Sequence, residues 1–266
     1  MDKQKKIAIV VQRCGKGIVA GAEIYAYELA QAIHAQDPQF EVDIYTSKSD
    51  NYIRWNNKLS LQEKINDHVK ILRFPVVHTR LLLLFRIVKR ISIYLNSFLY
   101  PLYFLFSGIL DYLFLRTQGP WCPTLWHELI QKQDEYSLII VKCYLYAPNV
   151  KIIKELASKT KVLFIVTAHK EPEFKLKFVG EILEKAHSLG FVSLSEEQLC
   201  KKTWPKSALK PYLILSPGLT PPTQDFINQC NTIPPRPEIQ DLLKKNFFLC
   251  LGRIDKNKNT PFLFKN

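Results

Sequence analysis

A glycine-rich loop near the N-terminus is the first segment whose residues suit ligand chemistry. The loop Cys14–Gly21 (CGKGIVAG) follows a short apolar run and contains Gly15, Gly17 and Gly21. Glycine lets the backbone approach a ligand closely, and the N-terminus of a following helix favours an anion. The spacing differs from the dinucleotide fingerprint, and no acidic residue is placed to hold a ribose. The loop is therefore either a ligand loop or only a tight turn, and Glu23 beside it either supports the loop or lies on the surface.

His169 is the histidine whose position suggests a role in chemistry. It follows the apolar run Lys161–Thr167 (KVLFIVT), so we expect it at the carboxyl edge of a sheet, where open α/β sheets bind ligands. A neutral imidazole there can hydrogen-bond a hydroxyl group or take up developing positive charge. The alternative is a structural histidine that caps the end of the strand. The other five histidines lack such a setting.

The cysteines indicate neither a zinc site nor a disulfide framework. No pair of the six has the two-to-four-residue spacing of a zinc knuckle. Six cysteines in 266 residues are also too sparse for a disulfide scaffold. We expect reduced thiols in a cytoplasmic protein, with no metal site.

The elements that must position these residues alternate between strands and helices. The expected strands cover 6–11, 41–46, 69–74, 137–142, 161–167, 189–194 and 212–215. The expected helices run for about four turns from Ala22 and over 149–158, 173–187 and 195–203. Ser195 and Gln198 have the spacing of a capping box at the start of the last helix. This order predicts an α/β fold, a Rossmann-like parallel sheet with helices on both faces.

A long apolar stretch interrupts this rhythm, inside an expected helical insertion near 80–133. Residues 91–110 carry no charge and reach the roughly 20 residues that a transmembrane helix needs. Pro101 breaks the stretch, and the strands on its two sides are expected in one sheet, which argues against a span. From His68 to Leu110 every charged residue is basic, which suits an interfacial helix on anionic lipid. Membrane-surface contact, a buried insertion and a true span are the three alternatives.

A shift in composition marks the end of the first domain. We expect one domain over 1–215 and a linker over 216–237, where six prolines in 22 residues exclude regular structure. Residues 238–266 would begin a second α/β domain, with a helix over 237–245 and a strand over 247–251. Because the chain stops soon after that strand, we expect the second domain to be truncated.

Five short motifs occur in the order that one enzyme class shows. They are AGAEIYAYELAQAI after the first strand, QGPWCPTL at 118–125, TAHKEP at 167–172, SPG at 216–218 and LGRIDKNKNT at 251–260. Together they resemble the retaining, family 4-like GT-B glycosyltransferases over nearly the whole chain. The resemblance implies an N-terminal acceptor domain followed by a C-terminal donor domain that binds a nucleotide-sugar.

The resemblance also implies roles for single residues. The Gly15–Gly21 loop would approach the acceptor or a phosphate, and His169 would contact the transferred sugar near the reacting carbon. Arg253 and Lys258 match the cations that hold the donor diphosphate, where they would stabilise leaving-group charge. The alternative for these two is a pair of solvated charges on a basic tail. Lys170 stands where the group usually has an acid, which leaves the preferred sugar open.

The implied function is transfer of a sugar from a nucleotide-sugar to a glycan or lipid-linked acceptor, as in polysaccharide biosynthesis. No cofactor is implied beyond the nucleotide-sugar substrate. The nucleotide pocket would follow Asn266, so we expect this chain to be an incomplete form that is inactive alone. The alternative is a non-catalytic remnant that binds an acceptor, a membrane or a partner. A nucleotide-dependent oxidoreductase is disfavoured by the glycine spacing.

The charge balance favours anionic partners. Lysine and arginine number 37 against 24 acidic residues, a formal net charge of +13. Nucleic acid is not expected, because the chain lacks a basic stripe with aromatic or glycine-rich reading motifs. The N-terminal apolar run is too short for a signal peptide and ends at Gln12 and Arg13. We therefore expect a cytoplasmic location, with peripheral contact to the inner face of the membrane as one alternative.

Overall fold

The computed structural model describes residues 5–18, 20–218, 224–232 and 234. The chain divides into two compact units, Met1–Gly218 and Leu219–Asn266. The first unit holds the sheet and all the described site residues. In the second unit the structure describes one helix, α8 (Gln224–Thr232).

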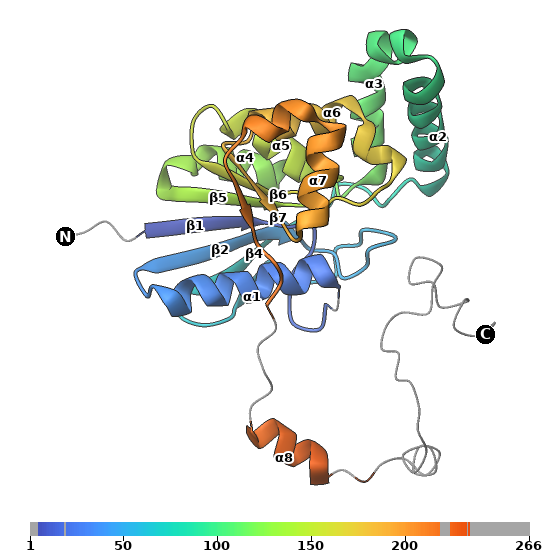
Figure 1. Ribbon diagram of the computed structural model, residues 1–266. Coiled ribbons are helices and arrows are strands. Elements are labelled where there is room, and N and C mark those ends of the chain that lie inside the picture. The colour runs from blue at the N-terminus through green and yellow to red at the C-terminus, as the bar shows by residue number, and fades with distance from the viewer. Residues whose placement is uncertain (1–4, 19, 219–223, 233, 235–266) are drawn as a thin grey trace, which may run out of the picture. The chain divides into compact units, whose positions relative to one another are not determined.

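An eight-stranded sheet forms the centre of the first unit (Figure 1). The strands are β1 (Lys5–Val10), β2 (Phe40–Ser47), β3 (Gln62–Lys64), β4 (Val69–Phe74), β5 (Tyr136–Lys142), β6 (Val162–Ile165), β7 (Ser188–Phe191) and β8 (Tyr212–Ile214). Their order is β3-β4-β2-β1-β5-β6-β7-β8, and every neighbouring pair is parallel except β3 with β4. The predicted parallel sheet is confirmed.

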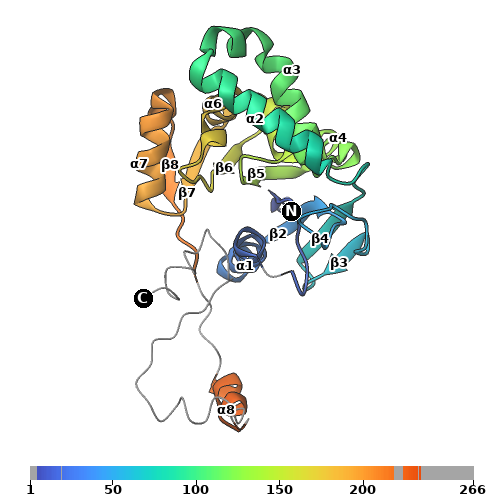
Figure 2. The ribbon, with the colours of Figure 1, turned by 90° about the vertical axis from the view of Figure 1, so that its right-hand side faces the viewer.

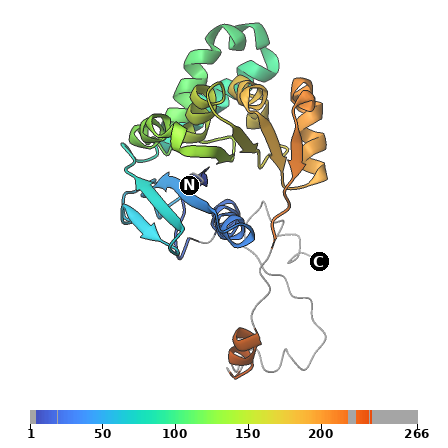
Figure 3. The same cartoon turned by 90° about the vertical axis from the view of Figure 1, so that its left-hand side faces the viewer.

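Helices cover both faces of this sheet, as predicted (Figure 3). Helix α1 (Gly21–Gln36) packs on one face, where Ala26 and Ala30 contact apolar residues of β1, β2 and β4. The other face is covered by α4 (Pro123–Gln131), α5 (Ala147–Leu156), α6 (Lys177–Lys185) and α7 (Leu194–Thr203). The apolar runs of the central strands supply side chains to both cores, which is why they contain few polar residues.

The predicted helical insertion is a two-helix hairpin followed by α4 (Figure 2). Helix α2 (Leu82–Phe98) packs against α3 (Tyr100–Gln118), and the break between them falls at Leu99, with Pro101 in the first turn of α3. Proline suits a first turn because that position needs no intrahelical N–H donor. Among the described residues, no helix is long and apolar enough to cross a membrane.

The hairpin contacts the core through polar as well as apolar groups. Lys89 of α2 pairs with the buried Glu173 in the short 3-10 helix Pro172–Lys175. The hydroxyl of Tyr103 on α3 accepts a hydrogen bond of 2.9 Å from the backbone N–H of Lys177 at the start of α6. These bonds fix the insertion to the elements that follow β6.

Some sequence predictions were wrong in detail. The predicted helix 173–187 is divided at Leu176, whose extended backbone separates the 3-10 helix Pro172–Lys175 from α6. Strand β3 was not predicted, because its three polar residues form a short antiparallel edge without an apolar pattern. Two further 3-10 helices cover Gln133–Glu135 and Pro205–Leu209.

Two further corrections concern a cap and the linker. The cap of α7 is Ser193, whose hydroxyl accepts from the backbone N–H of Glu196, so the predicted Ser195–Gln198 box is wrong. The predicted linker 216–237 contains α8, so prolines near its ends did not prevent a helix between them. The helix expected at 237–245 and the strand at 247–251 lie outside the described residues.

Candidate functional site

The candidate site lies at the carboxyl edge of β1, β5 and β6. From β1 the chain passes to β2 on one side, and it later returns to β5 on the other side of β1. Connections therefore leave these two neighbouring strands in opposite directions. In open α/β sheets, ligands bind at such a topological switch point, outside the carboxyl ends of the strands.

The glycine loop follows β1 and has the backbone shape that glycine permits. Gly15 and Gly17 have φ angles of 153° and 88°, which side chains other than hydrogen rarely allow. A Cβ atom on Gly15 would lie 2.3 Å from Nη2 of Arg73, so the close packing also requires glycine there. Gly21 begins α1, and its Cβ position is free of neighbouring atoms. The loop thus depends on Gly15 and Gly17 more than on Gly21.

Arg73 and Glu63 form hydrogen bonds with the backbone of this loop. Arg73, at the end region of β4, donates from Nε to the carbonyl oxygen of Cys14 at 3.0 Å and pairs with Glu63. The backbone N–H of Lys16 donates to Glu63 Oε1 at 3.3 Å. One amide of the loop is therefore already bound to a carboxylate of the chain.

A buried ion pair connects the start of the loop to α1. Arg13 donates from Nε to Glu23 Oε1 at 3.0 Å, and its Nη2 lies 2.9 Å from the same oxygen. The guanidinium also donates from Nη1 to the carbonyl oxygen of Asp50 at 2.9 Å. Glu23 is therefore buried and paired, so the alternative of a surface carboxylate is wrong. Removing either partner of such a pair destabilises the fold, because the remaining charge would be buried without a counter-charge.

Lys142, the last residue of β5, was not among the residues predicted to form the site. It is 2% exposed, and its Nζ lies 3.7 Å from the centre of the Tyr25 ring on α1. The same amine donates to Thr167 Oγ1 at 3.4 Å. No acidic side chain within 4.0 Å pairs with it in the described part of the chain. Burial lowers the pKa of Lys142, while the more distant Cys143, Glu196 and Glu23 raise it.

Two residues beside this lysine have left-handed backbones. Cys143 has a φ of 75° and Thr167 a φ of 57°. For a β-branched residue such as Thr167 this conformation is unfavourable by about 1–3 kcal/mol. Thr167 lies two residues after the end of β6, so this unfavourable backbone comes directly before the segment with His169.

Glu196 fixes the segment that carries His169. Its two carboxylate oxygens accept hydrogen bonds of 2.6 Å from the backbone N–H groups of Ala168 and Val192, which follow β6 and β7. Burial raises the pKa of Glu196, and these two hydrogen bonds oppose the rise. His169 itself is exposed, next to this rigid anchor. An exposed imidazole on a fixed backbone can meet a ligand without rearrangement.

The structure thus brings together part of the predicted site. Tyr25 from α1, Lys142 from β5 and Thr167 after β6 form a continuous set of contacts from the helix behind the glycine loop to the His169 segment. Lys170 is exposed beside His169. Arg253 and Lys258 lie outside the described residues.

The site has no feature of a metal centre in the described part of the chain. No group of three or more histidine, cysteine, aspartate or glutamate side chains is placed to hold a metal ion among the described residues. The four described cysteines, Cys14, Cys122, Cys143 and Cys200, are buried free thiols. Burial raises the pKa of Cys143 to about 11. It is therefore a protonated thiol at neutral pH and a weak nucleophile.

Comparisons with known proteins give structural neighbours only. No protein-family model and no curated protein matches the sequence. Among solved structures, the chain is similar to sucrose-phosphate synthase from Thermosynechococcus elongatus, with 15% identity and a TM-score of 0.48 over 91% of this chain and 100% of that chain. It is also similar to a trehalose-6-phosphate synthase, with 12% identity and a TM-score of 0.49 over 90% of this chain and 54% of that chain.

A third neighbour is the trehalose-6-phosphate synthase of Burkholderia multivorans, with 14% identity and a TM-score of 0.40 over 73% of this chain and 41% of that chain. The chain spans about half the length of the trehalose-6-phosphate synthases that it matches. These neighbours are GT-B glycosyltransferases, the class whose motifs the sequence resembles. Their TM-scores are too low to transfer substrates or site residues to this chain.

Proposed function

We propose that this protein takes part in transfer of a sugar from a nucleotide-sugar to a glycan or lipid-linked acceptor. In this proposal residues 5–218 supply the acceptor-side face of the active site. The observation that carries it is the grouping of the glycine loop, Lys142 and the His169 segment at the switch point of a parallel sheet. That edge is where a fold of this class binds its ligand.

Each group has a chemical task in this proposal. The exposed His169 hydrogen-bonds a hydroxyl group of the transferred sugar and opposes charge that develops near the reacting carbon. The buried cation of Lys142 acts through space, because a charge shielded from water creates a strong positive potential at the nearby edge. That potential favours a phosphate or diphosphate beside the glycine loop. Arg253 and Lys258 would add two cations for the leaving diphosphate.

A product assay tests the proposed activity. The full protein is incubated with UDP-, GDP- or ADP-sugars and a lipid or glycan acceptor extract, and release of the nucleoside diphosphate is followed. The sequence resemblance implies a chain that is inactive alone, whereas the proposal here is that the full protein is active. We therefore expect release with at least one donor and its loss in His169→Ala. His127→Ala serves as the matched control, because His127 is also exposed but lies on α4. Absence of release with every donor, or equal activity in both variants, would contradict the proposal.

We further propose that the α2–α3 hairpin contacts an anionic membrane surface, where a lipid-linked acceptor would be found. Sixteen of the twenty-six exposed large apolar side chains among the described residues lie between Leu81 and Tyr112. The same hairpin carries Arg86 and Arg90, both exposed and one helical turn apart on α2. A large apolar surface beside unpaired cations matches a layer of anionic headgroups over acyl chains.

Vesicle flotation tests the membrane contact. The protein is expected to float with vesicles that contain phosphatidylglycerol and to remain in solution with purely zwitterionic vesicles. Replacing Arg86 and Arg90 by glutamine should weaken the binding, because each basic residue near the surface contributes about 1 kcal/mol. Lys202, which is exposed, and Lys210, which is half-buried, provide a control with the same loss of charge outside the hairpin. Equal binding to both kinds of vesicle, or none, would contradict the proposal.

A further inference from the structure

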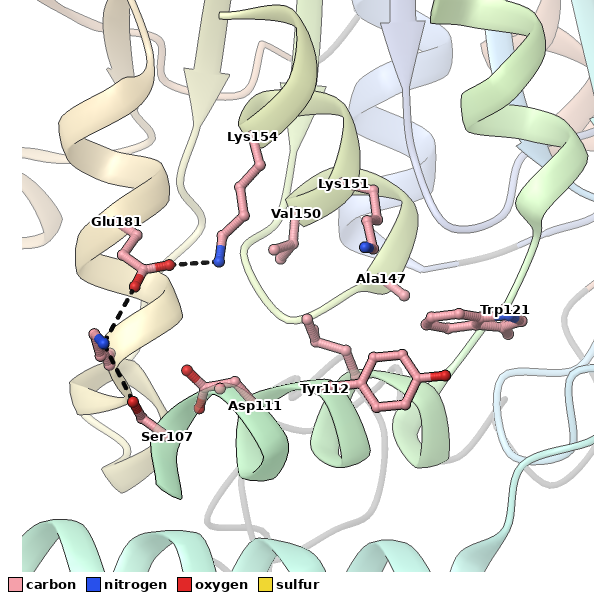
Figure 4. Close-up of a pocket in the computed structure, with 12 residues that line it drawn as sticks. Ser107, Asp111, Tyr112, Trp121, Ala147, Val150, Lys151, Lys154 and Glu181 are labelled. Carbon is pink, nitrogen blue, oxygen red and sulfur yellow. Dashed lines mark hydrogen bonds and ion pairs between the residues drawn. The ribbon is translucent and has the colours of Figure 1, made fainter. Parts of the chain in front are cut away.

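A cavity of about 320 Å³ lies between α3 of the insertion and the core helices α5 and α6 (Figure 4). It is lined by residues other than the glycine loop, Lys142 and His169, so it is separate from the site described above. Its volume falls at the lower end of the roughly 300–1,000 Å³ that small-molecule sites occupy. Its walls differ in character, with charged groups at one end and aromatic rings at the other.

The lining of the cavity includes three lysines and two acidic residues. Lys154 and Lys177 both pair with Glu181, the second at a distance of 3.8 Å. Lys151 lies one turn before Lys154 on α5, half-buried, and its amine has no hydrogen-bond or ion-pair partner among the described residues. One lysine amine therefore remains free at the wall of the cavity, and Figure 4 shows it on the side of Ala147 and Trp121.

The remaining acid of the cavity is already engaged. Asp111 on α3 accepts a hydrogen bond of 3.0 Å from the hydroxyl of Tyr103 and another from the backbone N–H of Phe178 in the first turn of α6. It thus serves as a cap that joins α3 to α6 and cannot also neutralise Lys151. An anion is the group that would pair with Lys151 in this cavity.

The other end of the cavity is lined by two aromatic rings. Trp121 and Tyr112 meet edge to face, with ring centres 5.7 Å apart and an interplanar angle of 86°. The indole N–H of Trp121 has no partner among residues 5–18 and 20–218, so it can donate to a ligand oxygen. Aromatic faces with a free polar tip bind rings that carry both C–H and O–H groups.

We propose that this cavity binds a phosphorylated monosaccharide, with the phosphate at Lys151 and the sugar ring against Trp121. Because α3 and α5 both line the cavity, the ligand also connects the insertion to the core. This site is independent of the proposed transferase activity, since its residues belong to a different surface of the unit.

Titration of the full protein with glucose 6-phosphate tests the proposal, followed by calorimetry and by tryptophan fluorescence. Glucose and inorganic phosphate are titrated separately. We expect the phosphorylated sugar to bind more tightly than either component, because it makes both contacts at once. Lys151→Met should weaken binding by about tenfold or more, since a charge-assisted hydrogen bond is lost. The matched control Lys159→Met removes an exposed lysine just beyond α5 and should leave the affinity unchanged.

The variants also separate this inference from the proposed transferase. His169→Ala should leave glucose 6-phosphate binding intact, whatever its effect on nucleotide-sugar chemistry. Absence of binding at millimolar ligand would overturn the inference. So would equal weakening by Lys151→Met and Lys159→Met, or inorganic phosphate binding as tightly as the phosphorylated sugar.

Discussion

Replacing Lys142 by methionine should make the protein more stable and should weaken ligand binding at the edge of the sheet. The lysine is 2% exposed and has no carboxylate partner within 4.0 Å in the described part of the chain. Burying such a charge costs several kcal/mol. The cation–π contact with Tyr25, whose ring centre lies 3.7 Å from the amine, offsets about 2 kcal/mol of this cost. The 3.4 Å hydrogen bond to Thr167 offsets about 1 kcal/mol of the cost at most.

Methionine keeps a similar length, and its sulfur also packs well against an aromatic ring. We therefore expect Lys142→Met to raise the free energy of unfolding by about 1–3 kcal/mol at pH 7. Urea unfolding followed by circular dichroism measures this change. The control Lys159→Met removes an exposed charge and should alter stability by about 0.5 kcal/mol or less.

The pH dependence of that difference has a definite sign. Burial lowers the pKa of Lys142 in the folded state, so the unfolded chain binds its proton more tightly. The wild type therefore gains stability as the pH rises through the folded pKa towards the ordinary lysine value of about 10.4. The advantage of the methionine variant should shrink over that range. A variant that is less stable than wild type at pH 7, or a difference that grows with pH, would refute the reasoning.

Three further predictions concern the scaffold. Burial raises the pKa of Asp111 to about 6, so its ionised form destabilises the fold, and Asp111→Asn should raise the unfolding free energy above pH 6 by up to about 3 kcal/mol. This gain should vanish near pH 4, and a gain that persists there would contradict the assignment. Gly15→Ala should lower stability by about 1–3 kcal/mol in urea unfolding, because the new Cβ would meet Arg73 at 2.3 Å. Ser193→Ala should lower the unfolding free energy by about 1 kcal/mol through loss of the α7 cap, whereas Ser195→Ala should change it little. A larger loss in Ser195→Ala than in Ser193→Ala would show that Ser195 is the cap.

The sequence predicted the sheet and its helices well because the central strands are nearly continuous apolar runs. The strand at 69–74 was placed at its observed bounds, and those near 137–142 and 6–11 within one residue. Local sequence patterns failed to identify the helix cap where two neighbouring residues have the same chemistry. Ser193 and Ser195 can both cap a helix, and only the turn after β7 decides between them.

The site was harder to predict than the fold. Glycine at 15 and 17 indicated an unusual loop, and the position of His169 after an apolar run placed it at the sheet edge. The sequence holds one indication of Lys142, because this charged residue ends the apolar run SLIIVK. Its meaning depends on Tyr25, which lies far away in the sequence and meets the lysine only when α1 packs on the sheet. Contacts of this kind follow from tertiary structure and have no local pattern.

Calorimetric titration with UDP-, GDP- and ADP-sugars tests the central claim most directly. It asks whether the edge formed by the glycine loop, Lys142 and His169 contributes to binding of a nucleotide-sugar. We predict that at least one donor binds the full protein, that His169→Ala and Lys142→Met each weaken the binding by about tenfold, and that His127→Ala does not. If no nucleotide-sugar binds, or if His169→Ala binds as tightly as wild type, the edge of the sheet does not contact the transferred sugar and the account is wrong.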